Sequence, residues 1–328
     1  MIRKKATLTV SADLADLFTV EPQQTSVTPT KEPVGISVQQ ALTTVLKQMV
    51  TTGHRERTMS DYELHVSHFV KVTGVKHLAD ISADWIYEWL ASMDVSNQTK
   101  LTRLKCLKAF LGRCFDNGWL TSKFWRNIVV KVDSPIKQGA EEKDVYTLLS
   151  LLDLMDFVQL RDATALLLIF QTGIRIGTLS NLTTKHIDMD DSLLKIDGGL
   201  LKNHQQMYLP FDSKMKRLLV ALIAQNDRIR KESQINNDRI FITMYGDPIS
   251  VSPTNNMIRK RFAKYSVMYG LPNINPHALR RGFAKRLLNK DAHIAFISKA
   301  LGHSDIAVTT RYLHIDKEEV ANKLRNYL

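Results

Sequence analysis

The chain has 328 residues, with 45 lysines and arginines against 33 aspartates and glutamates, a formal net charge of +12 at pH 7. A hydrophobic fraction of 44% excludes a wholly disordered protein, and the length predicts two domains or more. No apolar run of about 18 residues predicts a membrane span, no signal peptide is recognisable, and the positive excess favours a polyanionic partner.

Residues 1–37 form a predicted N-terminal arm. The arm carries four basic and four acidic residues, so the positive excess falls on the two regions that follow it. Its second half, 21–37, is rich in Pro, Thr and Gln, as is typical of a linker or tail. Alternating Ala6, Leu8 and Val10 permit one short strand before it.

Residues 38–130 have the hydrophobic spacing of a small helical domain. Ser37, Ser82 and the Asn117-Gly118 pair supply two helix caps and one helix end. The predicted helices run from 38 to about 51, from 58 or 60 through 69, from 82 through 90, and from 98 to 116.

The last of these helices combines a leucine stripe with a set of basic residues. A solvated face opposite the leucines is the commoner interpretation, and a DNA-contacting face is the functional one. Cys106 and Cys114 lie too far apart along this helix for a disulfide, which favours the reducing cytoplasm. The candidate DNA contacts are Lys100, Arg103, Lys105 and Lys108.

Residues 131–143 are polar, contain Pro135 and Gly139, and are predicted to be an interdomain linker. The second domain is predicted to span 144–328. Two alternating segments, 193–196 and 206–209, indicate a small antiparallel sheet. The predicted helices cover 144–155, 159–172, 175–182, 213–231, 253–268, 277–289, 292–301, 304–310 and 316–327.

The second domain lacks the common nucleotide-binding, zinc-binding and serine-hydrolase motifs. It contains instead an ordered set of Arg, Lys, His and Tyr. Each member alone is more often a surface charge, a cap or a packing residue, but the spacings together are far more specific. The set comprises Arg175 in a Thr-Gly-Ile-Arg box, Lys202 between the predicted strands, His277 and Arg280 in a His-Ala-Leu-Arg box, His303 in a Leu-Gly-His box, and Tyr312.

This ordered set resembles the tyrosine recombinases, or phage-integrase family, over about residues 38–328. The resemblance implies a mainly α fold with a small antiparallel β-sheet: a helical core-binding (SAM-like) domain and an α+β catalytic domain that clamp duplex DNA. Two positions depart from the family pattern, because Thr178 stands where many relatives have Glu and Arg281 where they often have His.

The resemblance assigns roles that suit the side chains. Arg175 and Arg280 would stabilise the charge that develops on a scissile phosphate, and His303 would donate a hydrogen bond to it. Tyr312 would attack as the nucleophile and form a 3′-phosphotyrosine.

Two further residues would move protons: His277 is the candidate for accepting the phenol proton, and Lys202 for protonating the departing 5′ oxygen. No metal and no cofactor are expected. The partners implied are duplex DNA with inverted-repeat core sites and a homotetramer, with accessory proteins left open. The segment 316–328 would either pack on its own domain or dock into a neighbouring protomer.

The leading hypothesis is therefore site-specific recombination, with integration or excision of a mobile element placed before a Xer-like resolution of replicon dimers. A type IB topoisomerase uses similar chemistry and remains an alternative, as does a DNA-binding homologue without catalysis. The arm of 37 residues is shorter than the usual arm-binding domain of λ-type integrases, which favours a simple two-domain recombinase acting in the cytoplasm.

Overall fold

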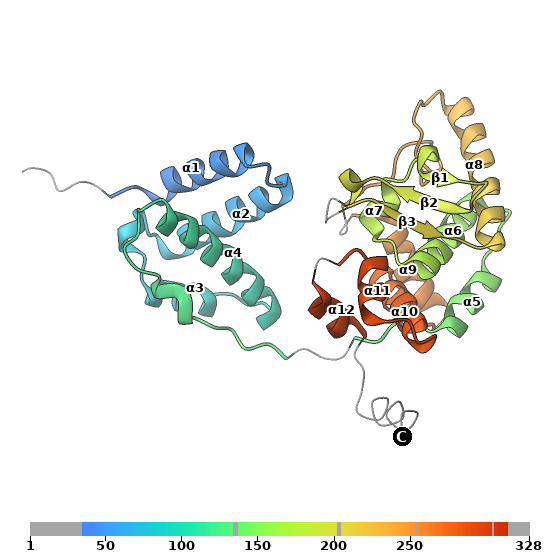
Figure 1. Ribbon diagram of the computed structural model, residues 1–328. Helices are drawn as coiled ribbons and strands as arrows, with labels where there is room; N and C mark the ends of the chain where they lie inside the picture. Colours follow the sequence, from blue (N-terminus) through green and yellow to red (C-terminus); the bar gives the residue numbers. More distant parts are fainter. Residues whose placement is uncertain (1–34, 134–136, 202–204, 253–254, 304, 314–328) are drawn as a thin grey trace, which may run out of the picture. The chain divides into compact units, whose positions relative to one another are not determined.

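The computed structural model describes residues 35–133, 137–201, 205–252, 255–303 and 305–313. The chain divides into two compact units, residues 1–134 and 135–328, which Figure 1 colours from blue to green and from green to red. The described residues are mostly helical and contain one small antiparallel sheet, so the predicted fold class is confirmed. The predicted strand near residues 6–10 and the predicted helix 316–327 lie outside the described residues.

Over its described residues, 35–133, the first unit has four α-helices and two short 3-10 turns. Ser37 begins the first helix with a capping box, in which its hydroxyl and the Gln40 side chain each bond the other's backbone N–H. The hydroxyls of Ser82 and Ser96 cap two further helices. The helices are α1 (Val38–Thr51), α2 (Glu56–Thr73), α3 (Ala83–Ala91) and α4 (Asn97–Asp116).

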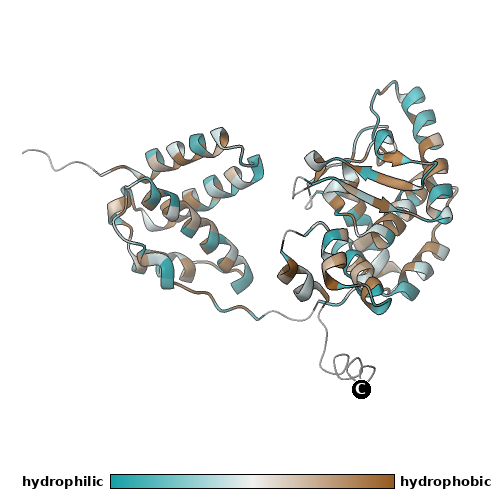
Figure 2. Cartoon of the chain, in the orientation of Figure 1, coloured by the Kyte–Doolittle hydropathy of each residue, from teal (hydrophilic) through white to brown (hydrophobic). Residues whose placement is uncertain are grey.

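The core of the first unit forms where the apolar stripes of these helices meet. Phe69, Trp89 and Phe110 are completely buried there, and the rings of Phe69 and Trp89 make an edge-to-face contact at 5.6 Å. Figure 2 shows hydrophilic and hydrophobic residues on the same helices in both units. This amphipathic pattern is what allowed the helices to be predicted from the sequence.

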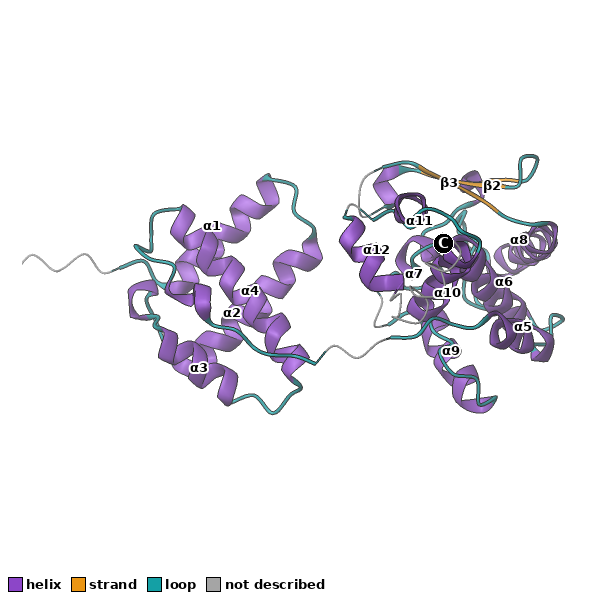
Figure 3. Ribbon diagram, turned by 60° about the horizontal axis from the view of Figure 1, so that its bottom comes forward, coloured by secondary structure: helices purple, strands orange, loops and turns teal. Residues whose placement is uncertain are grey.

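The second unit places eight α-helices around a three-stranded antiparallel sheet of order β1-β2-β3 among the described residues. Leu194 pairs with Leu209, and both side chains are buried. Figure 3, in which strands are orange, shows the sheet on one side of the helices. The elements are α5 (Glu142–Leu151), α6 (Phe157–Thr172), α7 (Ile176–Ser180), β1 (Ile187–Asp188), β2 (Leu193–Ile196), β3 (Met207–Pro210), α8 (Ser213–Ser233), α9 (Met257–Met268), α10 (Pro276–Asn289), α11 (Ile294–Ala300) and α12 (Ile306–Leu313).

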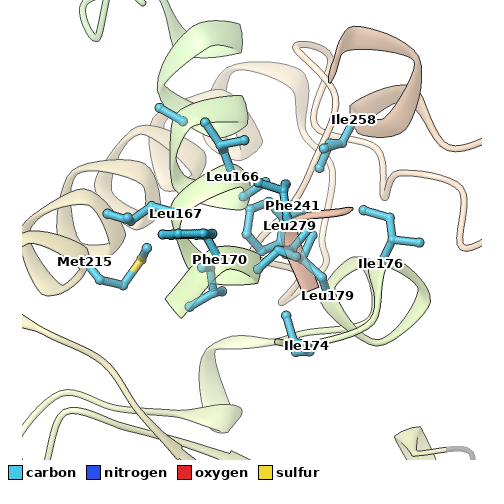
Figure 4. Packing of buried hydrophobic residues seen from close by; sticks show 14 of the residues in the cluster. Leu166, Leu167, Phe170, Ile174, Ile176, Leu179, Met215, Phe241, Ile258 and Leu279 are labelled. Atoms are coloured by element: carbon cyan, nitrogen blue, oxygen red, sulfur yellow. The ribbon is translucent and has the colours of Figure 1, made fainter. Parts of the chain in front are cut away.

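Helix α6 is the central helix of this unit, because it is buried on nearly every side. Figure 4 shows its residues Leu166 and Phe170 packed near Leu179 and Leu279, which come from α7 and α10. A helix that is buried on nearly every side must be enclosed by neighbours, and α8, α9 and α10 contact it. The position of the α6 C-terminus is therefore fixed by packing from several directions.

A buried charged network also ties α6 to α9. Asp162, which is fully buried, accepts hydrogen bonds from the guanidinium groups of Arg161 and Arg261 and from the Tyr265 hydroxyl. Burial and the Asp162 charge raise the pKa of Tyr265 to about 12. Removing one partner from such a buried network leaves an uncompensated charge, which typically costs about 3–5 kcal/mol.

The end of the expected linker is part of the second unit. The backbone N–H of Ala140 donates to the Ala278 carbonyl at 2.8 Å, and Arg281 Nε donates to the Gln138 carbonyl at 2.9 Å. A Cβ on Gly139 would lie 2.8 Å from the Gly282 nitrogen, so the two backbones approach as closely as glycines allow. We call residues 137–140 the strap, because they are held along α10.

Several boundaries differ from the predicted ones for local reasons. Helix α5 ends at Leu151, not 155, because the Leu152 backbone is extended (φ −85°, ψ 133°). Helix α9 begins after the Asn256 cap, not at 253. The two-residue strand β1 was not predicted, since it is too short to show an alternating pattern. Helix α12 runs to Leu313, beyond the predicted end at 310.

Candidate active site

Three of the six predicted catalytic residues meet in the second unit. Arg175 lies in the turn between α6 and α7, Arg280 on α10, and His303 in the turn between α11 and α12. Arg280 Nη2 is 3.1 Å from His303 Nε2, and Arg175 Nη2 donates to the carbonyl of Gly302 at 3.2 Å. Segments separated by more than a hundred residues in the sequence thus form one cationic cluster.

The turn that carries Arg175 depends on Gly173. This glycine ends α6 in the left-handed conformation, with φ of +64°. A Cβ at this position would lie 2.4 Å from Phe283 Cδ1 and 3.0 Å from Leu301 Cδ2. Any larger residue would therefore push the turn away from α10, and Arg175 with it.

Arg280 is almost completely buried, with 4% of its surface exposed. Its guanidinium group donates to the carbonyls of Gly173 and Leu301, in addition to its contact with His303. Its helix begins at Pro276, and Asn275 caps it by accepting from the Ala278 N–H at 2.9 Å. Arg280 therefore links the two turns that present Arg175 and His303.

His303 is held on both ring nitrogens. Nε2 faces the guanidinium of Arg280, and Nδ1 lies 2.8 Å from the hydroxyl of Thr309 on α12. Burial, followed by the charges of Arg280 and Arg175, lowers the pKa of His303 to about 4. The imidazole is therefore neutral at pH 7 in the DNA-free chain.

His277 stands at the start of α10, three residues before Arg280, with an exposed side chain. Although the side chain is exposed, neighbouring atoms partly desolvate its ring and lower its pKa, and the charges of Arg281, Arg280 and Lys137 lower it further. Lys137 belongs to the strap, so the end of the expected linker adds a positive charge close to this histidine. The lowered pKa keeps the imidazole unprotonated and so able to accept a proton, while the nearby positive charges make it a weaker base.

The other two predicted catalytic residues are only partly covered by the structure. Tyr312 lies within α12, in the same helix as Thr309. Buried Leu313 and Leu301 belong to a small apolar cluster formed by α10, α11 and α12. The packing of Leu313 thus holds α12 next to the turn that carries His303. Lys202 lies outside the described residues, in the connection between β2 and β3.

The side chains of the cluster are of the kinds that bind anions. Two guanidinium groups and a histidine converge on one region, and guanidinium groups form strong charge-assisted hydrogen bonds with phosphate oxygens. In the described part of the chain, no group of three or more His, Cys, Asp or Glu side chains is placed to hold a metal ion.

The predicted DNA contacts on α4 do not share one face. Lys105 lies about 140° around the helix from Lys100. Arg103 is half-buried and contacts Met93 Sδ at 3.5 Å, and Lys108 donates to the Arg126 carbonyl at 3.0 Å. Their role in DNA binding stays a prediction, and the four residues do not form a single basic stripe along α4.

Two features of the site were not predicted from the sequence. The Thr309 hydroxyl bonds His303, although Thr309 had no assigned role. Arg281 holds the strap, although the sequence showed it only as a departure from the family's usual histidine. The Leu-Gly-His box six residues before Thr309 is the one signal that could have drawn attention to that residue.

Comparison with known proteins decides the family. Residues 141–319, more than half of the chain, match the phage integrase family. The chain belongs to the phage integrase family. It is 28% identical over 225 residues to the tyrosine recombinase XerC of Thermodesulfovibrio yellowstonii, covering 67% of this chain and 72% of the relative. It is 27% identical over 234 residues to XerC of Staphylococcus epidermidis, covering 69% and 75%.

Solved structures share the fold of this phage-integrase-family chain. The Tn1549 transposon integrase in complex with a circular intermediate DNA has a TM-score of 0.71 at 17% identity, covering 89% of this chain and all of that one. A λ integrase dimer bound to a core site has a TM-score of 0.61 at 17% identity, covering 85% and 77%. The chain is thus a tyrosine recombinase, an enzyme of site-specific recombination.

Proposed function

We propose that this tyrosine recombinase cuts and rejoins duplex DNA through a covalent bond between Tyr312 and the 3′ phosphate of the cut strand. The observation that carries the proposal is the convergence of Arg175, Arg280 and His303 next to the helix that contains Tyr312. An anion site beside a tyrosine suits phosphoryl transfer to a phenol better than it suits passive binding.

In the cleavage step, the Tyr312 oxygen attacks the scissile phosphorus. The new phosphotyrosine bond forms as the bond to the 5′ oxygen breaks, so the number of phosphoester bonds is unchanged. Arg175 and Arg280 stabilise the charge on the non-bridging oxygens, and always-protonated guanidinium groups suit that task.

Two proton transfers complete the step. His277, whose pKa is lowered, accepts the phenol proton, and Lys202 donates a proton to the departing 5′ oxygen. The 5′-hydroxyl of another strand then attacks the phosphotyrosine, with both transfers reversed. No ATP is consumed, because the phosphotyrosine keeps the bond energy of the original phosphodiester.

The assembly that we propose is a homotetramer on two duplexes with inverted-repeat core sites. One solved structure of the same fold is a λ integrase tetramer bound to a Holliday junction, with a TM-score of 0.63. Integration or excision of a mobile element is the leading role, supported by the integrase fold. A Xer-like role is the second candidate, because the relatives at 27–28% identity are XerC recombinases.

A two-duplex assay tests the proposal. Duplexes that carry a cognate site, with one partner labelled, should yield recombinant products and Holliday junctions in the presence of the protein. A protein that relaxes supercoiled plasmid without exchanging strands would instead be a type IB topoisomerase. A protein that binds the site without cutting it would be a non-catalytic homologue.

A further inference from the structure

Thr309 has a placement that the proposed mechanism does not yet use. It lies on α12, is completely buried, and its hydroxyl oxygen is 2.8 Å from His303 Nδ1. Tyr312 follows three residues later in the same helix. The bond between Thr309 and His303 therefore connects the nucleophile's helix to the cationic cluster.

The contacts of His303 define where its proton lies. A guanidinium group has only donors, so His303 Nε2 must accept the hydrogen bond from Arg280 with its lone pair. In a neutral imidazole the proton is then on Nδ1, which donates it to the Thr309 hydroxyl. The DNA-free chain thus holds His303 in the Nδ1–H tautomer.

Donation to a phosphate requires a different arrangement. His303 Nε2 must then carry a proton, so either the ring changes tautomer or it becomes doubly protonated. A hydroxyl both donates and accepts, so Thr309 can bond Nδ1 in each of these forms. A purely apolar side chain at this position could form no hydrogen bond with Nδ1 in any of these forms.

We propose that Thr309 is a positioning residue, which holds His303 through its change from acceptor toward Arg280 to donor toward the scissile phosphate. The role of Thr309 in cleavage rests on the proposed function of His303, but its hydrogen bond to Nδ1 does not. Thr309 touches neither the substrate nor the reacting atoms in this account and acts through His303.

The neighbouring threonine supplies a matched control. Thr310 lies on the same helix, but its side chain is exposed and its hydroxyl donates to the Ile306 carbonyl at 3.2 Å. Thr310→Val therefore makes the same chemical change one residue away, without touching His303. Thr309→Val keeps the shape of the side chain and removes its hydroxyl, and Thr309→Ser keeps the hydroxyl.

The first measurement is independent of catalysis. Long-range proton–nitrogen NMR spectra of the DNA-free protein with labelled histidine report the tautomer of each ring. Because the Arg280 donor sets the tautomer, all four proteins should show His303 with its proton on Nδ1, and only in Thr309→Val should the Nδ1–H resonance shift upfield through loss of its hydrogen bond. A wild-type His303 with its proton on Nε2 would overturn the proposal, whether or not the protein cuts DNA.

The second measurement is the rate of covalent adduct formation on saturating nicked DNA. Leaving a buried donor without its partner typically costs a factor of about 5 to 150, so Thr309→Val should slow the rate by about 10- to 100-fold. Thr309→Ser and Thr310→Val should stay within about threefold of the wild type. Equal rates for Thr309→Val and the wild type would refute the proposal.

A double-mutant cycle separates positioning from loss of folding. If Thr309 acts through His303, Thr309→Val should have little further effect in a His303→Leu background. Full additivity of the two substitutions would show that Thr309 acts by another route. A wild type that forms no adduct would contradict the proposed function, and the NMR result would still decide the tautomer.

Discussion

Replacing Gly282 by alanine tests how tightly the strap is packed against α10. Gly282 lies within α10, two residues after Arg280. A Cβ at this position would lie 2.4 Å from the Ala140 carbonyl oxygen and 2.9 Å from Phe170 Cε2. Both distances are shorter than real Cβ contacts, and neither neighbour is a flexible side-chain end, since one is backbone and the other a buried ring.

The expected cost follows from opposing effects. Alanine favours the helix over glycine by about 1 kcal/mol. Overpacking a filled site costs about 1–3 kcal/mol, and losing the hydrogen bond from Ala140 to Ala278 costs about 1 kcal/mol more. We therefore expect Gly282→Ala to lower the free energy of unfolding of the second unit by about 1–3 kcal/mol.

Gly112 provides the matched control. It lies inside α4, and a Cβ there would have no atom within 4 Å, so Gly112→Ala should stabilise its own unit by up to about 1 kcal/mol. In calorimetry of the full chain, Gly282→Ala should lower the transition of the second unit by about 3–10 °C. A Gly282→Ala protein as stable as the wild type, or more stable, would refute the close packing of strap and helix.

Three further outcomes follow from the site. Arg280→Lys keeps the charge but cannot reproduce the forked contacts, so cleavage should fall about 100- to 1,000-fold; cleavage within tenfold of the wild type would count against the role of Arg280. Lys202→Ala should slow cleavage of a nicked site by about 100-fold or more while DNA binding is retained; unchanged cleavage would remove Lys202 from the mechanism. The His303 ring should titrate near pH 4 in the folded chain. Because the unfolded chain binds that proton near pH 6.5 and the folded chain does not, the free energy of unfolding should fall as the pH is lowered from about 6.5 to about 4. An NMR midpoint near 6.5 would contradict the burial described for this ring.

Local secondary structure was predicted best from the sequence. Helix α1 was predicted with its observed bounds because Ser37 caps it and its apolar residues recur at helical spacing. The two longer strands were predicted from alternation, and β2 was placed with its exact bounds. The catalytic boxes were also recognisable, because their order along the chain is itself the signal.

Contacts between distant segments could not be predicted. The bonds from Arg280 to Gly173 and Leu301 join residues 107 and 21 positions apart, and no periodicity reports such pairs. The polar sequence of the strap predicts a linker, yet one backbone hydrogen bond and one from the Arg281 side chain hold it on α10. In the sequence Thr309 is an ordinary helix residue, and only the structure shows that its hydroxyl bonds His303.

The most direct test of the account is to find which residue becomes linked to DNA. A nicked duplex that carries the cognate site should trap a covalent adduct, and mass spectrometry of its proteolytic fragments should locate the nucleotide on Tyr312. Tyr312→Phe should abolish the adduct and keep DNA binding, and Tyr208→Phe, at an exposed position on β3, should leave the adduct unchanged. A nucleotide attached to another residue, or an adduct that persists in Tyr312→Phe, would contradict the central claim.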